Sequence, residues 1–253
     1  MSISIGITGQ LGFIGSHLFS SLRVKDDIRI IPSNDDLFIH KDILCNFVKS
    51  CDVIIHLAGM SRGTNQQEIY DTNILLIKQL IEAMKEEKTS PKVFFASTIH
   101  RDHDTLYHKS KRDGTILFNN WAAETNSNFT TLILPNVYGP FGCPYFNSFV
   151  STFCHKVANG ESPEIIEDNP VQLIYINNLC NRFYNIINTE TNDNIHSIPH
   201  DVEKSVSEIL SLLKRFRNLY ILGGIIPTFK NDFELFLFNT FISYIDILVK
   251  NDN

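Results

Sequence analysis

The sequence lacks any run of basic residues. Its 22 Lys and Arg residues are outnumbered by 28 Asp and Glu residues, and the formal net charge of -6 is spread along the 253 positions. A nucleic-acid partner would require clustered cations that displace counterions from the phosphate backbone. The composition therefore argues against nucleic acid as a partner.

Close cysteine pairs and a clean apolar segment of membrane-spanning length are also missing. The five cysteines are odd in number and scattered, which favours reduced thiols over disulfides or zinc ligands. The most apolar stretch, 233–249, is interrupted by Glu234, Asn239 and Asp246 and is shorter than the roughly 20 residues that a membrane helix needs. We interpret it as a core helix or a homodimer-interface helix and expect no membrane partner.

The N-terminus enters an apolar run at Ile3 without the basic region and cleavage site of a secretory signal, which predicts a cytoplasmic protein. Strand-like runs then alternate with amphipathic helical runs, a pattern typical of a parallel sheet covered by helices on both faces. The expected strands are 3–8, 28–31, 53–57, 93–97 and 131–134, and the expected helices are 12–22, 42–50, 66–85 and 107–124.

The predicted fold class is α/β, a Rossmann-type doubly wound parallel sheet with a smaller C-terminal substrate-binding cap. Residues 1–135 are predicted to form the dinucleotide-binding domain. Glycines and prolines become frequent after Pro135, so the smaller region is predicted at 136–253, with chain segments free to interleave.

A glycine-rich turn follows the first expected strand. Glycines at every third position permit a tight turn, a close approach of the backbone to a pyrophosphate and close packing of the next helix. The helix N-terminus also presents free N–H groups to an anion. The candidate cofactor-binding residues of this turn are Gly9, Gly12, Phe13, Ile14 and Gly15.

Ser33 and Asn34 follow the second expected strand, where NAD-binding proteins commonly place a carboxylate for the ribose. No acid stands there, although Asp35 and Asp36 lie slightly later. Ser33 and Asn34 are candidate contacts for a 2′-phosphate. NADP(H) is therefore favoured as the cofactor, with NAD(H) as the alternative.

Tyr107 and Lys111 lie four residues apart at the start of an expected helix, so their side chains share one face. A lysine ammonium beside a tyrosine is predicted to lower the pKa of the phenol from about 10. Thr98 ends a strand and can donate a hydrogen bond to a carbonyl oxygen that gains charge. These three residues are the candidate catalytic set.

Together these motifs resemble the extended short-chain dehydrogenases/reductases, the family of nucleotide-sugar epimerases, dehydratases and reductases. The resemblance implies that Asp42 and Ile43, after a third strand, contact the adenine. It also implies that Asn73 supports the active-site helix and a proton relay. Asp42 as a helix cap and Asn73 as an exposed polar residue are the alternatives. Further cofactor contacts are implied for the segment after His56, at Leu57, Ala58 and Gly59.

The short spacing between Thr98 and Tyr107 resembles the reductase domain of capsular-polysaccharide enzymes that make UDP-N-acetyl-L-fucosamine. Such enzymes reduce the 4-keto group of a UDP-2-acetamido-2,6-dideoxyhexulose and usually continue into a metal-binding cupin domain, so a stand-alone reductase is implied. Asn136, Asn147 and Gln172 match positions near the sugar or the diphosphate, with Gln172 where many members have arginine. Asn147 as the N-cap of the next helix is the alternative.

The resulting hypothesis is NAD(P)H-dependent reduction of a UDP- or dTDP-linked 4-keto-6-deoxyhexose for surface-polysaccharide synthesis. A 4-epimerase of the same family and a non-catalytic NADP-binding sensor are the alternatives. His100, His103 and His108 cluster with acids, but their spacing fixes no tetrahedral ligand set, and we expect no metal.

Overall fold

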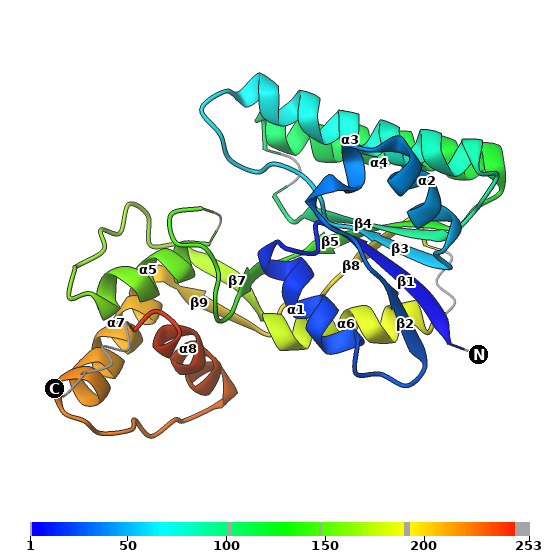
Figure 1. Cartoon of the computed structure of the whole chain (residues 1–253). Helices are drawn as coiled ribbons and strands as arrows, with labels where there is room; N and C mark the ends of the chain where they lie inside the picture. The colour runs from blue at the N-terminus through cyan, green and yellow to red at the C-terminus, as the bar shows by residue number, and fades with distance from the viewer. Residues whose placement is uncertain (1, 101–102, 147, 190–192, 246–253) are drawn as a thin grey trace, which may run out of the picture. The chain divides into compact units, whose positions relative to one another are not determined.

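The computed structural model of the chain describes residues 2–100, 103–146, 148–189 and 193–245 (Figure 1). The chain forms two compact units. The first contains the residues up to Pro135 together with Ile176–Pro199, and the second contains Asn136–Tyr175 and the residues from His200 onward. The segment Ile176–Pro199 thus lies with the first unit although it follows residue 135, so the two units interleave along the sequence.

The first unit is built on a six-stranded sheet in the order β2-β1-β3-β4-β5-β8. All five strand pairs are parallel, which confirms the predicted α/β class. The strands are β1 (Ile3–Thr8), β2 (Ile28–Ile31), β3 (Val53–His56), β4 (Lys92–Thr98), β5 (Phe129–Leu134) and β8 (Ile195–Ser197). The strand order reverses at β1, so the carboxyl ends of β1 and β3 mark the position where such sheets bind ligands.

Helices cover both faces of this sheet (Figure 1). Two of them, α1 (Phe13–Leu22) and α6 (Ile176–Ile187), pack together on one face. The other face is covered by α2 (Lys41–Lys49), α3 (Gln66–Glu86) and α4 (Leu106–Thr125). The central strands are largely apolar because both of their faces are buried: every residue of β3 and β5 is buried.

The third strand expected just before Asp42 is absent from this part of the structure. Residues 32–40 contain the short 3-10 helix η1 (Asp35–Phe38), and α2 begins directly afterwards. Asp42 lies in the first turn of α2, where a carboxylate interacts favourably with the helix dipole. His40, not Asp42, occupies the N-cap position.

The second unit contains a three-stranded sheet in the order β6-β7-β9. Strand β7 (Pro170–Tyr175) pairs in parallel with β6 (Asn136–Tyr138) and antiparallel with β9 (Val202–Ser205). The helices of this unit are α5 (Phe149–Ala158), α7 (Val206–Phe216), the π-helix η2 (Arg217–Leu222) and α8 (Asp232–Ile242).

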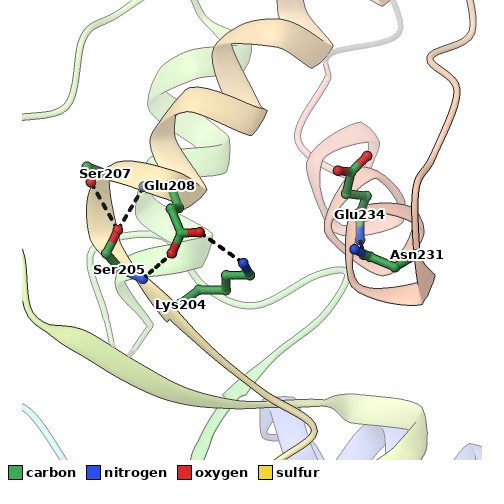
Figure 2. A network of polar contacts seen from close by, with 6 residues as sticks. All are labelled: Lys204, Ser205, Ser207, Glu208, Asn231 and Glu234. Carbon is green, nitrogen blue, oxygen red and sulfur yellow. Dashed lines mark hydrogen bonds and ion pairs between the residues drawn. The ribbon is translucent and has the colours of Figure 1, made fainter.

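Helix α7 begins with a capping box, shown in Figure 2. Ser205 Oγ accepts the backbone N–H of Glu208, and the carboxylate of Glu208 accepts the N–H of Ser205. The ammonium of Lys204 lies 2.9 Å from the same carboxylate. Asn231 caps α8 similarly by accepting the N–H of Glu234. These caps satisfy N–H groups that a helix start leaves without partners.

The first part of the apolar C-terminal stretch, residues 233–242, lies in α8, which is a core helix of the second unit. Leu237 and Phe241 are completely buried, and Phe241 and Phe238 pack around the ring of Phe216. No helix among the described residues has the length and apolarity to span a membrane.

The carboxylate of Glu234 is buried in α8 and lies 2.7 Å from the Arg215 guanidinium. Burial raises the pKa of Glu234, but hydrogen bonds from Arg215 and from the Lys230 N–H outweigh it, so the net pKa is lowered. The pair therefore stabilises the fold above the ordinary pKa of a glutamate, and this stabilisation is lost as the pH falls through the lowered value.

We expect Arg215→Met to reduce the free energy of unfolding at pH 7 by about 2 kcal/mol, because it leaves a buried carboxylate without its cation. Urea unfolding followed by circular dichroism measures the loss. Glu234→Gln combined with Arg215→Met is the control and should recover part of it. An equal loss at pH 7 and at pH 4 would contradict the electrostatic explanation.

Candidate active site

The glycine-rich turn joins β1 to α1. Gly9 has a φ of +71°, which favours glycine, and its carbonyl accepts the N–H of Gly12. A Cβ on Gly15 would lie 2.2 Å from the Gly9 oxygen, so the helix approaches the turn too closely for any side chain. Gly12 is the N-cap of α1 and has no side chain that could accept the N–H groups of the first turn. This cradle fits the pyrophosphate of a dinucleotide.

Ser33 lies beside the glycine turn, two residues after the end of β2. Its hydroxyl donates to the carbonyl of Ile7, 2.6 Å away, and its N–H points to the side-chain oxygen of Gln10. Asn34 is exposed, and its amide nitrogen lies 3.5 Å from Asp36 Oδ2. Gln10, which was not predicted as a site residue, connects the glycine turn to the segment after β2.

Asn73 is buried on α3 and connects two parts of the candidate site. Its amide oxygen accepts the N–H of Met60, and its amide nitrogen donates to the Met60 carbonyl and to Ser110 Oγ. The Ser110 hydroxyl donates to the carbonyl of Tyr107, 2.6 Å away. Asn73 is therefore not an exposed polar residue: it ties the segment after β3 to the start of α4. Ser110 was missed, although its place within Tyr-x-x-Ser-Lys was a usable signal.

Three neighbouring residues follow the carboxyl end of β3: Leu57, Ala58 and Gly59. Leu57 and Ala58 are half-buried and Gly59 is exposed. A Cβ on Gly59 would lie 2.9 Å from the Asn73 amide oxygen, so this position also requires glycine. Asp42 and Ile43 are exposed at the start of α2.

The structure brings Thr98, Tyr107 and Lys111 to the carboxyl end of β4 and the adjoining start of α4. Thr105 caps α4, which places Tyr107 in the first turn of the helix and Lys111 one turn later. The Lys111 ammonium lies 5.8 Å from the centre of the Tyr107 ring and donates to the carbonyl of Ala96, 3.0 Å away. It also lies 4.7 Å from the centre of the Phe95 ring.

Burial sets the protonation of this pair. Lys111 is almost completely buried, and burial lowers the pKa of its ammonium to about 8. Burial raises the pKa of Tyr107, which is opposite to the lowering predicted from the sequence. The physical reason is that removal of the phenol from water opposes its ionisation, and this exceeds any effect of the ammonium.

The hydroxyl of Thr98 contacts the backbone two residues later in the chain. Thr98 Oγ1 accepts the N–H of His100, 3.2 Å away, so its proton stays available for donation. The rings of His100 and His103 lie 5.0 Å apart, and those of His103 and His108 lie 5.2 Å apart. Within the described ranges, no group of three His, Cys, Asp or Glu residues has a geometry that could hold a metal ion.

The candidate sugar-binding residues belong to the second unit. Asn136 on β6 donates to the backbone carbonyl of Gln172 on β7, 3.2 Å away, so these two residues lie together. Asn147 lies outside the described residues. The N-cap of α5 is Ser148, whose hydroxyl accepts the N–H of Ser151, so the alternative role of Asn147 as this cap is wrong.

The fold and this group of residues define a Rossmann-fold dehydrogenase/reductase of the extended short-chain class. The model of the NAD dependent epimerase/dehydratase family matches residues 5–197, and the chain belongs to that family. Its members are nucleotide-sugar enzymes of the epimerase and oxidoreductase type that use NAD(P).

Individual relatives agree with this assignment. A UDP-2-acetamido-2,6-beta-L-arabino-hexul-4-ose reductase of Pseudomonas aeruginosa is 27% identical over 222 residues, which are 84% of this chain and 57% of that protein. The capsular polysaccharide assembling protein CapF of Staphylococcus aureus has a TM-score of 0.77 at 24% identity, over 96% of this chain and 65% of that one. RMD of Pseudomonas aeruginosa, solved with NADPH, has a TM-score of 0.78 at 16% identity, over 96% of this chain and 99% of that one. The chain thus spans less than two thirds of the length of the hexulose reductase and of CapF.

Proposed function

We propose that the protein reduces the 4-keto group of a nucleotide-activated 4-keto-6-deoxyhexose with NAD(P)H. The observation that carries the proposal is the pairing of Tyr107 with Lys111, whose ammonium donates to the Ala96 carbonyl on β4, the strand that Thr98 ends. The similarity to a UDP-hexulose 4-reductase supports the substrate class. A UDP-linked acetamido sugar or a dTDP-linked sugar satisfies the same chemistry.

In this proposal the bound dinucleotide supplies the hydride, and the protein supplies the proton. Tyr107 donates its phenol proton to the C4 oxygen. The raised pKa keeps the phenol protonated near neutral pH, so its proton is present when the hydride arrives, but it also makes the phenol a weaker acid. Thr98 donates a hydrogen bond to the same oxygen and stabilises its developing negative charge.

Lys111 is proposed to hold the ribose of the cofactor. A lysine ammonium has three N–H donors, and the Ala96 carbonyl uses one of them. Ser33 and Asn34 are proposed to contact a 2′-phosphate, so NADP(H) is the preferred cofactor. Asn136 and Gln172, with Asn147, are proposed to contact the sugar diphosphate.

The direct test is to incubate the protein with NADPH or NADH and the 4-keto-6-deoxy derivatives of UDP-N-acetylglucosamine and dTDP-glucose. We expect stoichiometric consumption of NADPH with one of the two sugars. Conversion of a sugar without net consumption of the dinucleotide would indicate a 4-epimerase instead. Tight NADP binding with no conversion of any keto sugar would indicate a sensor.

The lowered pKa of Lys111 predicts a pH dependence of cofactor affinity. Deprotonation removes the cation and one donor, so we expect the affinity for NADPH to fall about tenfold as the pH rises from about 7 to about 9. Isothermal titration calorimetry at each pH measures it. Lys111→Met should bind weakly at every pH, with no trend across this window. A fall of the same size in Lys111→Met would assign the titration to another group.

A further inference from the structure

His56 is a buried titratable residue for which the proposed chemistry has no role. It ends β3, its side chain is completely buried, and its ring stacks on Phe95 at a centroid distance of 5.7 Å. The Lys111 ammonium lies 4.7 Å from the centre of the same Phe95 ring. Burial, and then the charge of Lys111, lower the pKa of His56 to about 3, so the imidazole is neutral at physiological pH.

A polar ring at this buried position costs folding free energy. His56 Nε2 is buried and has no hydrogen-bond partner within the described part of the chain. The ring's apolar contacts with Phe95 and Phe118 could be made by an aromatic residue without that cost. Any specific contribution of the imidazole must therefore come from its other nitrogen.

His56 Nδ1 lies 2.8 Å from the hydroxyl of Thr8, which is also completely buried. The same hydroxyl accepts the backbone N–H of Ala58, 3.3 Å away. A hydroxyl has one donor and two acceptor sites, so Thr8 can donate to Nδ1 while it accepts from Ala58. The imidazole thus holds the threonine hydroxyl in the orientation that receives the Ala58 N–H.

This small network lies between the two loops that would hold the dinucleotide. Thr8 directly precedes Gly9 of the glycine turn, and Ala58 follows the end of β3. The two loops touch through their backbones, since a Cβ on Gly9 would lie 2.8 Å from the Ala58 nitrogen. Their spacing depends on whatever fixes Ala58 relative to Thr8.

We infer that His56 is a positioning residue for the dinucleotide site and that it acts through Nδ1, which orients the Thr8 hydroxyl and thereby fixes Ala58 against the glycine turn. The inference rests on the proposed use of this turn for NAD(P)H. His56 itself touches neither the cofactor nor the substrate in this account. Its removal should therefore weaken cofactor binding and raise the KM for NADPH, with little change in kcat.

Two substitutions separate positioning from simple filling of the core. In His56→Asn the amide can take the place of Nδ1, whereas in His56→Gln it takes the place of Nε2, which has no partner. Gln fills more of the ring's volume than Asn does, so a packing role predicts that Gln is the milder change. Positioning through Nδ1 predicts the reverse.

The experiment measures the dissociation constant of NADPH by isothermal titration calorimetry on the full chain, alongside the unfolding temperature of each variant. We expect His56→Asn to bind within about threefold of the unsubstituted protein and His56→Gln to bind about tenfold more weakly, as the loss of one orienting hydrogen bond implies. Equal affinities of the two variants, or tighter binding by His56→Gln, would overturn the inference.

If neither histidine variant folds, substitutions of Thr8 test the inference instead. Thr8→Val removes the oxygen on which His56 acts, and Thr8→Ser keeps it. A dissociation constant of NADPH that rises about tenfold in Thr8→Val and returns to its original value in Thr8→Ser supports the inference. An unchanged dissociation constant in Thr8→Val overturns it. An unsubstituted protein that binds NADPH but reduces no keto sugar would instead refute the proposed function and leave this inference standing.

Discussion

Tyr107→Phe is expected to lower kcat about 1,000-fold while the dissociation constant of NADPH stays within about twofold. The substitution removes only the phenol hydroxyl. The ring of Tyr107 and its distance from the Lys111 ammonium can remain, so the cofactor contacts are unaffected. Steady-state rates with the keto sugar and calorimetric titration with NADPH measure the two quantities separately.

The effect of this change on kcat and on kcat/KM also tests the role of the proton. An interaction made only in the transition state lowers both by the same factor. Tyr70→Phe is a matched control, because Tyr70 on α3 donates to the carboxylate of Asp113 on α4 and belongs to no candidate site. A Tyr107→Phe enzyme with normal turnover would remove Tyr107 from the reaction.

Gly15→Ala has the second-largest expected effect. The new methyl group would lie 2.2 Å from the Gly9 oxygen and 2.9 Å from the Gln10 Cα, and both of these are backbone atoms that no rotamer change can move. The turn must shift away from α1, so we expect the affinity for NADPH to fall at least about 100-fold. The strain should also reduce the free energy of unfolding by about 2 kcal/mol.

Gly12→Ala is the graded control for this prediction. Its methyl group meets a single atom, the Gly9 oxygen, at 3.2 Å, so a displacement of a few tenths of an ångström relieves the contact. The loss of affinity should be clearly smaller than in Gly15→Ala. If both variants bind NADPH as well as the unsubstituted protein, the turn is not the pyrophosphate site.

Local sequence patterns predicted most of the first unit because its elements are determined by short-range periodicity. The strands β1 and β2 begin and end where expected, and the other three predicted strands and all four predicted helices differ by one or two residues at their ends. Helix α6 and the edge strand β8 were missed. Strand β8 has three residues, of which Ile195 and Ser197 are exposed, and only its pairing with β5 makes it a strand.

The candidate site was predictable where reactive residue types recur at a fixed spacing along the chain, as for Tyr107 and Lys111 four positions apart. Long-range contacts were not predictable in the same way. The bond from Asn73 to Ser110 joins residues 37 positions apart, and no pattern along the chain specifies it. The direction of the Tyr107 pKa was predicted wrongly because a sequence shows the neighbouring charge but not the depth of burial.

The return of Ile176–Pro199 to the first unit has a consequence for synthesis of the protein on the ribosome. Strand β8 joins the sheet beside β5 through Thr131↔Ile195 and the two following pairs, and α6 covers the face next to α1. A nascent chain that has emerged only to Pro135 still lacks this strand and this helix. We expect it to expose the open edge of β5 and the apolar side of α1 until nearly two hundred residues have been translated, and so to be a target for chaperones during that interval.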